Sequence, residues 1–184
     1  MSAHTIDTTH SEISFTVRHM MFAKVRGQFK KWTAALDYNP ADPTRSKVRA
    51  EIDVASIDTR EAQRDGHLRS GDFFDAEKFP TMTFASKRIE AKGKGLYTLV
   101  GDLTIRDVTR EVSLEVEQTG GGKDPWGNQR LGFTLKGAIN RGDWGLKWNQ
   151  ALEAGGVLVS DKVDLEAEVQ VVQAAASATA SAAT

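Results

Sequence analysis

The chain contains no cysteine, which excludes a disulfide scaffold, a thiolate metal site and a cysteine nucleophile. It also lacks an excess of either charge, since 24 Lys and Arg residues face 25 Asp and Glu residues and the formal net charge is -1. That balance argues against a protein that binds nucleic acid through overall charge, so we expect no nucleic-acid partner. With 184 residues, 40% of them hydrophobic, the chain suits one domain with a substantial core or a lined cavity.

No run approaches the roughly 18 apolar residues that a membrane-spanning helix requires, so we expect no transmembrane segment. Residues 1–12, MSAHTIDTTHSE, lack the basic and apolar regions of a signal peptide. The sequence as written therefore predicts a cytoplasmic protein, or a periplasmic one if a leader has been removed. The absence of cysteine does not decide between these compartments, because exported proteins can also lack it.

Motifs for catalysis and phosphate binding are also absent: there is no GxSxG, no Walker loop and no GxGxxG. The four histidines have neither HxH nor HxxxH spacing, although His10 and His19 flank a predicted strand and Asp7 lies nearby in the sequence. Metal ligands usually come with recognisable spacing, so we interpret these side chains as structural or solvated. We predict no catalytic residue, no metal site and no cofactor. A site assembled from scattered residues lies beyond a motif search.

The feature that the sequence does contain is alternation of apolar and polar residues. Ile13, Phe15 and Val17 fall on one face of a predicted strand, and polar residues fall on the other. The alternation resumes after a link of about five residues and continues over 25–38, with a slip of parity near residues 31–32. Two adjacent alternating strands with a short link indicate a β-hairpin.

The same period of two recurs along the chain and gives about eight strands in total. The later predicted strands span 47–57, 81–89, 96–105, 111–117, 131–139 and 161–171. The segment 58–80 breaks the pattern, and we predict in it a short helix capped by Thr59 and ending at Leu68 or Arg69. Eight antiparallel strands can close into a filled or ligand-holding barrel, and periodicity alone leaves a β-sandwich open.

The end of the chain differs in composition from the rest. Residues 174–184 are small and polar, with too little apolar surface to order themselves. We therefore predict a domain spanning 1–173 followed by a disordered tail. Glycines interrupt the apolar faces of three predicted strands, at Gly27, Gly101 and Gly137. They leave room inside a barrel, or they mark a bulge or bend.

Six segments in order, from about residue 5 to about residue 172, together resemble a known family. The segments are DTTHSEISFTVRH, VRGQF, SIDTREAQRDGHLRSGDFFDAEKFPTMTF, GDLTIRDVTREVSLEV, INRGDWGLKWNQ and VSDKVDLEAEVQ. The chain resembles the bacterial YceI-like family of lipocalin-like polyisoprenoid-binding proteins. The third segment is the most specific, because a helix-like RDGHL followed by FFD, a proline and a TF strand is not a generic pattern.

The resemblance implies an all-β fold, an eight-stranded antiparallel lipocalin-like barrel with one short helical crossover and a lipid in its lumen. We expect non-enzymatic binding, storage or transport of a polyprenyl chain, an isoprenoid quinone or a similar amphiphilic or fatty lipid. The tail would lie in the lumen and the head group near the mouth. The residues expected to line the lumen are Ile13, Phe15, Val17, Phe29, Val48, Ile52, Met82, Phe84, Leu99, Leu103, Val112, Leu114, Leu131, Phe133, Leu135, Val163 and Leu165.

Two alternatives of other classes stay open at this point. One is an enzyme acting on such a lipid, which would need a polar constellation inside the lumen. The other is a structural or interaction protein with a filled core, which is the commoner explanation of an apolar stripe when the family resemblance is set aside. Aromatic residues in predicted loops, such as Trp126 and Trp144, leave a homodimer open.

A basic stretch lies between Ile13 and Leu36, where the chain carries five basic residues and no acid. These residues are Arg18, Lys24, Arg26, Lys30 and Lys31. A solvated outer face is the simplest interpretation. The functional interpretation is a patch near the mouth of the barrel that attracts an anionic head group or makes peripheral contact with a membrane.

Overall fold

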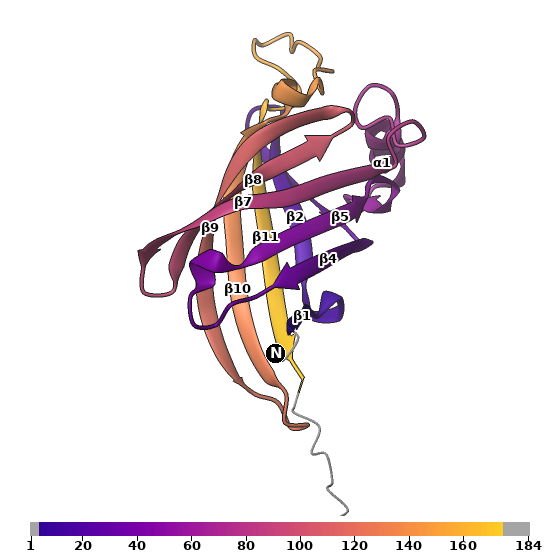
Figure 1. The fold of residues 1–184 in the computed structure, drawn as a ribbon. Helices are drawn as coiled ribbons and strands as arrows, with labels where there is room; N and C mark the ends of the chain where they lie inside the picture. Colours follow the sequence, from indigo (N-terminus) through magenta and orange to yellow (C-terminus); the bar gives the residue numbers. More distant parts are fainter. Residues whose placement is uncertain (1–3, 175–184) are drawn as a thin grey trace, which may run out of the picture.

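One antiparallel sheet, curled around a cavity, makes up most of the computed structural model of the chain, which describes residues 4–174 (Figure 1). The strands are β1 His4–Ile6, β2 Glu12–His19, β3 Ala23–Phe29, β4 Trp32–Asp37, β5 Lys47–Asp53, β6 Ile57–Asp58, β7 Thr81–Gly93, β8 Leu96–Ile105, β9 Val108–Lys123, β10 Gln129–Asn140 and β11 Lys162–Gln173. The described residues contain one α-helix, α1, at Ala62–Arg69. The predicted all-β class with one short helical crossover is therefore confirmed. The predicted tail lies outside the described residues except for its first position, and the division into domain and tail stays a prediction.

The order of neighbouring strands explains the curled shape. It runs β4-β5-β7-β8-β9-β10-β11-β2-β3-β6, and β1 pairs with β11. Because all these strands belong to one sheet, a β-sandwich does not form. β3 and β4 lie close to opposite ends of this path, yet Lys30 and Lys31 join them directly along the chain. At this seam only the chain itself connects the two strands, because the described strands form no hydrogen-bonded β3–β4 ladder.

The sheet contains eleven strands rather than the eight predicted. The predicted strand over 25–38 is interrupted at Lys30, so that β3 pairs with β2 whereas β4 pairs with β5. β1 and β6 are three and two residues long, which is too short for a period of two to reveal them. β9 also continues through the glycines at 120–122, beyond the predicted strand over 111–117, because its ladder to β10 outweighs the weak strand preference of glycine.

The helix α1 begins and is held differently from the prediction. Glu61 caps it, since its carboxylate accepts hydrogen bonds from the backbone N–H groups of Gln63 and Arg64. Thr59, the predicted cap, instead donates its backbone N–H to Asp65 Oδ1 at 2.9 Å, and its hydroxyl donates to the same atom. The first turn of α1 is thereby fixed to the segment after β6. No helix between residues 4 and 174 is long and apolar enough to cross a bilayer.

The tightly packed core lies close to α1. Val54 and Ile57 are each 1% exposed, and they belong to one cluster with Phe73 and Trp144. The indole N–H of Trp144 donates to the carbonyl oxygen of Leu103 at 3.0 Å. Trp144 was one of the aromatic residues in predicted loops that left a homodimer open, but it is buried in this core and offers no dimer surface.

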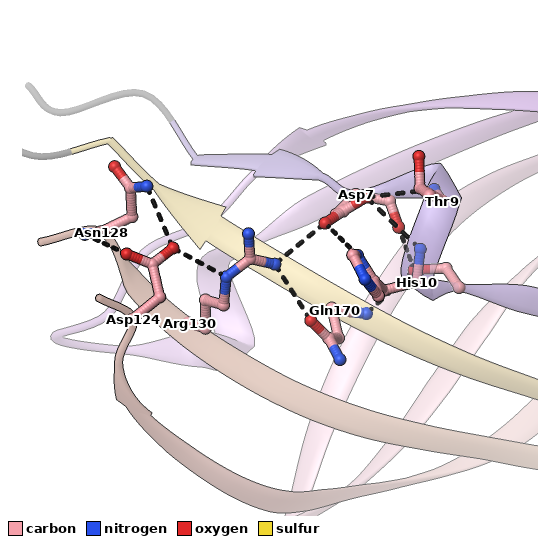
Figure 2. A network of polar contacts seen from close by, with 8 residues as sticks. Asp7, Thr9, His10, Asp124, Asn128, Arg130 and Gln170 are labelled. Atoms are coloured by element: carbon pink, nitrogen blue, oxygen red, sulfur yellow. Dashed lines mark hydrogen bonds and ion pairs between the residues drawn. The ribbon is translucent and has the colours of Figure 1, made fainter. Parts of the chain in front are cut away.

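The end of the barrel opposite α1 is held by a polar network around Arg130 (Figures 1 and 2). Arg130 Nη1 donates to Asp7 Oδ2 at 2.9 Å and to Gln170 Oε1 at 3.1 Å, while Nε donates to Asp124 Oδ2 at 3.0 Å. Asp7 Oδ2 also lies 2.8 Å from His10 Nδ1. The network fastens the N-terminal segment to β11 and to the turn between β9 and β10.

Both carboxyl groups in this network have low pKa values. Hydrogen bonds from Arg130 and then from His10 hold the pKa of Asp7 at about 2. Burial alone would raise the pKa of Asp124, but hydrogen bonds from Asn128 and Arg130 outweigh that effect and hold this pKa at about 2. Folding therefore stabilises the ionised forms of both groups.

Lowering the pH from about 4 to about 2 is expected to destabilise the protein through these two groups. The ordinary pKa of the carboxyl in the unfolded chain is 3.8, so the stabilisation is complete above that value and is lost as the pH falls through the folded value. Thermal unfolding midpoints measured across this range test the expectation. Arg130→Met should flatten the dependence, and an equally steep dependence in that variant would assign the acid sensitivity to other carboxyl groups.

Candidate binding cavity

The inner face of the curled sheet borders a cavity of about 710 Å³. Fifteen of the seventeen residues predicted to line a lumen border it. They are Ile13, Phe15, Val17, Phe29, Val48, Ile52, Met82, Phe84, Leu99, Leu103, Val112, Leu114, Leu135, Val163 and Leu165. Aliphatic and aromatic side chains dominate the lining, and contact of these residues with a lipid stays a prediction.

The two exceptions are Leu131 and Phe133, which do not border the cavity. β10 is twelve residues long, and these two residues belong to the end of the strand that carries the β9–β10 turn. There the ring of Phe133 lies 6.1 Å from that of Tyr38, which in turn lies 5.1 Å from His4. Burial raises the pKa of the Tyr38 hydroxyl. The period of two correctly predicted that Leu131 and Phe133 lie in a strand, but it did not predict their position along the barrel axis.

Neighbouring side chains occupy the space beside the inward glycines, so the glycines do not enlarge the cavity. The ring of Phe15 lies against Gly27, its direct partner across the β2–β3 ladder. The ring of Phe84 covers Gly101 from a diagonal position on the neighbouring strand, and a side-chain methyl group of Leu114 would lie 2.6 Å from a Cβ at Gly137. The glycines allow bulky neighbours to lie flat on the strands, which corrects the interpretation that they leave free room.

The cavity reaches the surface between the end of β2 and the first turn of α1. Arg18, Glu61 and Gln63 border the cavity and are exposed, and Arg64 and His67 border it beside them. The basic stretch predicted Arg18 near the mouth, but no pattern in the sequence predicted the polar residues of α1 and its cap there. Those residues lie on a helix, where a period of two carries no information about what faces the cavity.

Arg141 organises the long segment that flanks this opening. Its guanidinium is buried and donates to four backbone carbonyl oxygens: Leu146 at 2.7 Å, Trp148 at 2.9 Å, Ser160 at 3.0 Å and Val159 at 3.4 Å. Burial lowers the pKa of this guanidinium. Arg141 is a structural staple, because the carbonyl groups of its own loop use its donors.

His67 stands beside the cavity in a mainly aromatic environment. Its Nε2 lies 2.8 Å from Asp72 Oδ2, and its ring lies 4.6 Å from Trp148 and 5.1 Å from Phe73. A histidine oriented by a carboxylate is one part of an acid–base or nucleophilic site. Among the described residues, no hydroxyl, thiol or amine side chain is hydrogen-bonded to this ring, so a nucleophile for it to activate is missing there.

The other histidines do not form a metal site. Within residues 4–174 no group of three or more His, Asp and Glu side chains is arranged to hold a metal ion. His10 belongs to the Arg130 network, and His19 borders the cavity at the end of β2.

The five basic residues of the predicted patch do not act together. Arg26 Nη2 contacts Glu12 Oε1 at 3.3 Å, and Lys30 Nζ contacts Asp58 Oδ2 at 2.8 Å, which matches the solvated outer face. Arg18 borders the cavity opening. The functional interpretation is therefore restricted to the tip of the β2–β3 hairpin.

Comparison of the sequence with known families and proteins gives consistent matches over most of its length. The sequence profile of the YceI-like domain matches residues 4–171. A UPF0312 protein of Staphylococcus epidermidis is 41% identical over 171 residues, which covers 92% of this chain and 97% of the relative. A UPF0312 protein of Staphylococcus aureus is 39% identical over 172 residues, with the same coverage of both chains.

Solved structures share the fold. The Campylobacter jejuni YceI protein superposes with a TM-score of 0.75 at 32% identity, covering 95% of this chain and 100% of its own. Burkholderia cenocepacia BcnA gives a TM-score of 0.77 at 24% identity, covering 90% and 98%. A polyisoprenoid-binding domain from Saccharophagus degradans, implicated in plant cell wall breakdown, gives 0.66 at 17% identity, covering 95% and 100%. At these identities the last two matches bear on the fold alone.

Proposed function

This chain belongs to the YceI-like domain family, and on that premise we propose that it binds a long apolar chain in its cavity without chemically changing it. The cargo is a polyprenyl chain, an isoprenoid quinone or a similar amphiphile, held for storage or transport. The apolar cavity of about 710 Å³ is the observation that carries the proposal. A domain that shares only the fold is described as polyisoprenoid-binding, and we name this class of cargo by analogy with it.

The size of the cavity argues against a filled core. Packed protein interiors contain few voids larger than a water molecule. An engineered apolar cavity of about 150 Å³ already takes up benzene or xenon. The present cavity is several times larger and lies within the range of about 300–1,000 Å³ that ligand pockets occupy. Burial of an apolar chain there would contribute roughly 25 cal/mol per Å².

The position of the polar groups suggests how the cargo is oriented. The exposed polar residues of the lining gather at the opening near α1, whereas the far end of the barrel holds the rings of Tyr38 and Phe133 beyond the cavity. A tail would therefore lie between the strands with its head group near Arg64 and His67. We favour binding over catalysis because the ring partners of His67 are a carboxylate and two aromatic residues, without a nucleophile.

Organic extraction of purified protein followed by mass spectrometry is expected to release a long-chain species. The variant Ala50→Phe should remove most of it. Ala50 borders the cavity between Ala34 and Phe84 across the ladders, so a phenyl ring there would occupy space that the cargo needs. In a filled core this substitution would cost about 1–3 kcal/mol through overpacking. In an open cavity we expect the delipidated protein to lose no stability.

Ala35→Phe is the matched control, because Ala35 neighbours Ala34 on β4 but is exposed on the outer face. It should change neither lipid content nor the denaturant midpoint. Repeated extractions without any long-chain species, together with core-type destabilisation by Ala50→Phe, would favour the filled core. Conversion of an extracted lipid by the wild-type protein, lost in His67→Ala, would favour the enzyme.

A further inference from the structure

The turn between β2 and β3 carries three consecutive exposed apolar residues, which we call the apolar turn: Met20, Met21 and Phe22. Their exposed fractions are 42%, 60% and 73%. Met20 has a φ of 52° and Met21 a φ of 70°, a left-handed conformation that hairpin turns usually assign to glycine or asparagine. The turn is therefore unfavourable in both backbone conformation and hydration. Glycine or asparagine, the usual residues of such turns, would remove both costs.

The apolar turn lies beside the opening of the cavity. Arg18 and His19 border the cavity, and the next residue, Met20, donates its backbone N–H to the carbonyl oxygen of Leu158, which also borders it. Met21 rests on Gly156, where its sulfur would lie 3.0 Å from an added Cβ. The turn is thus positioned by the same segment that Arg141 staples, at the rim of the opening.

Two cations stand directly behind the apolar turn. Arg18 and Lys24 are direct partners across the β2–β3 ladder, an arrangement of like charges that disfavours the folded state. Arg18 donates to the carbonyl oxygen of Phe22, and within residues 4–174 neither cation forms an ion pair with an acid. An anionic partner outside the chain would satisfy both charges.

We propose that the apolar turn docks this protein on an anionic lipid bilayer. The three apolar side chains enter the interface between head groups and acyl chains, and Arg18 and Lys24 contact the lipid phosphates. The opening of the cavity then faces the bilayer, so an apolar chain passes from the bilayer into the cavity, or back, with little exposure to water. This inference rests on the proposed function for its purpose, but docking is measured separately from cargo binding.

Sedimentation with vesicles tests the docking. Wild-type protein should bind vesicles of equal parts phosphatidylcholine and phosphatidylglycerol. The double variant Met20→Asn with Met21→Gly should bind about tenfold or more weakly, because it removes two apolar side chains that docking would bury in the bilayer. The same variant should keep or raise the denaturant midpoint, since asparagine and glycine suit the left-handed turn. A purely structural role for the methionines predicts the opposite change in stability.

The charge is tested by Lys24→Gln, which should weaken binding to the mixed vesicles about fivefold and leave binding to pure phosphatidylcholine unchanged. Lys94→Gln, in the β7–β8 turn, is the control for charge. Trp126→Ser is the control for exposed apolar surface, since Trp126 is 78% exposed and follows β9 at the other end of the barrel. Neither control should alter binding.

Three results would overturn the proposal: no binding of wild-type protein, unchanged binding by the methionine double variant, or equal loss in the Trp126 control. A wild-type dimer that the double variant dissociates, without vesicle binding, would assign the apolar turn to a second copy of the chain. Mass spectrometry of the same samples separates the two proposals. Retained cargo without vesicle binding refutes only the docking, and vesicle binding without cargo refutes only the proposed function.

Discussion

Replacing Arg141 by methionine is expected to lower the free energy of unfolding by about 2–4 kcal/mol. Methionine keeps the apolar part of the side chain but has no hydrogen-bond donor. The carbonyl groups of Leu146, Trp148 and Ser160 would lose this donor, and each buried carbonyl left unpaired costs about 1–3 kcal/mol. The carbonyl group of Val159 would keep its 2.8 Å hydrogen bond from Asn149 Nδ2. Relief from burying a charge offsets part of this loss.

Urea unfolding measures the total loss, and hydrogen exchange locates it. We expect the amide groups of residues 146–160 to lose protection, because Arg141 connects both ends of that segment. Arg110→Met is the matched control. Arg110 is exposed and makes one long hydrogen bond, 3.4 Å, to the carbonyl oxygen of Asp143, so its loss should stay below about 0.5 kcal/mol. Equal midpoints for both variants would show that Arg141 does not hold the segment.

Gly101→Ala is expected to be the most damaging single-methyl addition on the inner face. A Cβ at this position would lie 2.6 Å from the carbonyl oxygen of Ala85 and closer still to the ring of Phe84. The carbonyl belongs to the β7 backbone beside the β7–β8 ladder and cannot move without disturbing it. We expect a loss of about 1–3 kcal/mol, the range for overpacked sites.

Gly27→Ala is the natural comparison because it also places a methyl group under an aromatic ring. There the neighbours of the added Cβ are atoms of the Phe15 ring alone, and that ring can turn into the cavity. Stability should fall by less than about 1 kcal/mol, while extracted lipid should decrease because the ring enters its space. Equal destabilisation by the two alanines would mean that the Phe15 ring is fixed.

Alternation along the strands predicted which side chains face inward but not how far along the barrel each one lies. Ile13, Phe15 and Val17 border the cavity as expected. Leu131 and Phe133 obey the same pattern but lie beyond the cavity, because strand length and stagger decide depth. Sequence periodicity contains neither quantity, and it cannot reveal strands as short as β1 and β6.

The residues around the opening of the cavity could not be predicted from the sequence for a different reason. Arg141 lies after a strand in a glycine-rich stretch, where an arginine is usually solvated. Only the path of residues 146–160 around its guanidinium makes it a buried staple. His67 and Arg64 similarly face the cavity because Asp65 ties α1 to Thr59, a contact that no repeat or motif announces.

The pairing of β11 with β2 has a consequence for folding during synthesis. Leu165 pairs with Phe15, so the two strands that complete the sheet are made at opposite ends of synthesis. Until β11 emerges, the apolar face of β2 lacks one of its neighbours, and pairings of such long sequence separation form slowly. A lipid has no enclosed cavity to enter before that ladder forms. Bound lipid should therefore slow unfolding of the folded protein without speeding its folding.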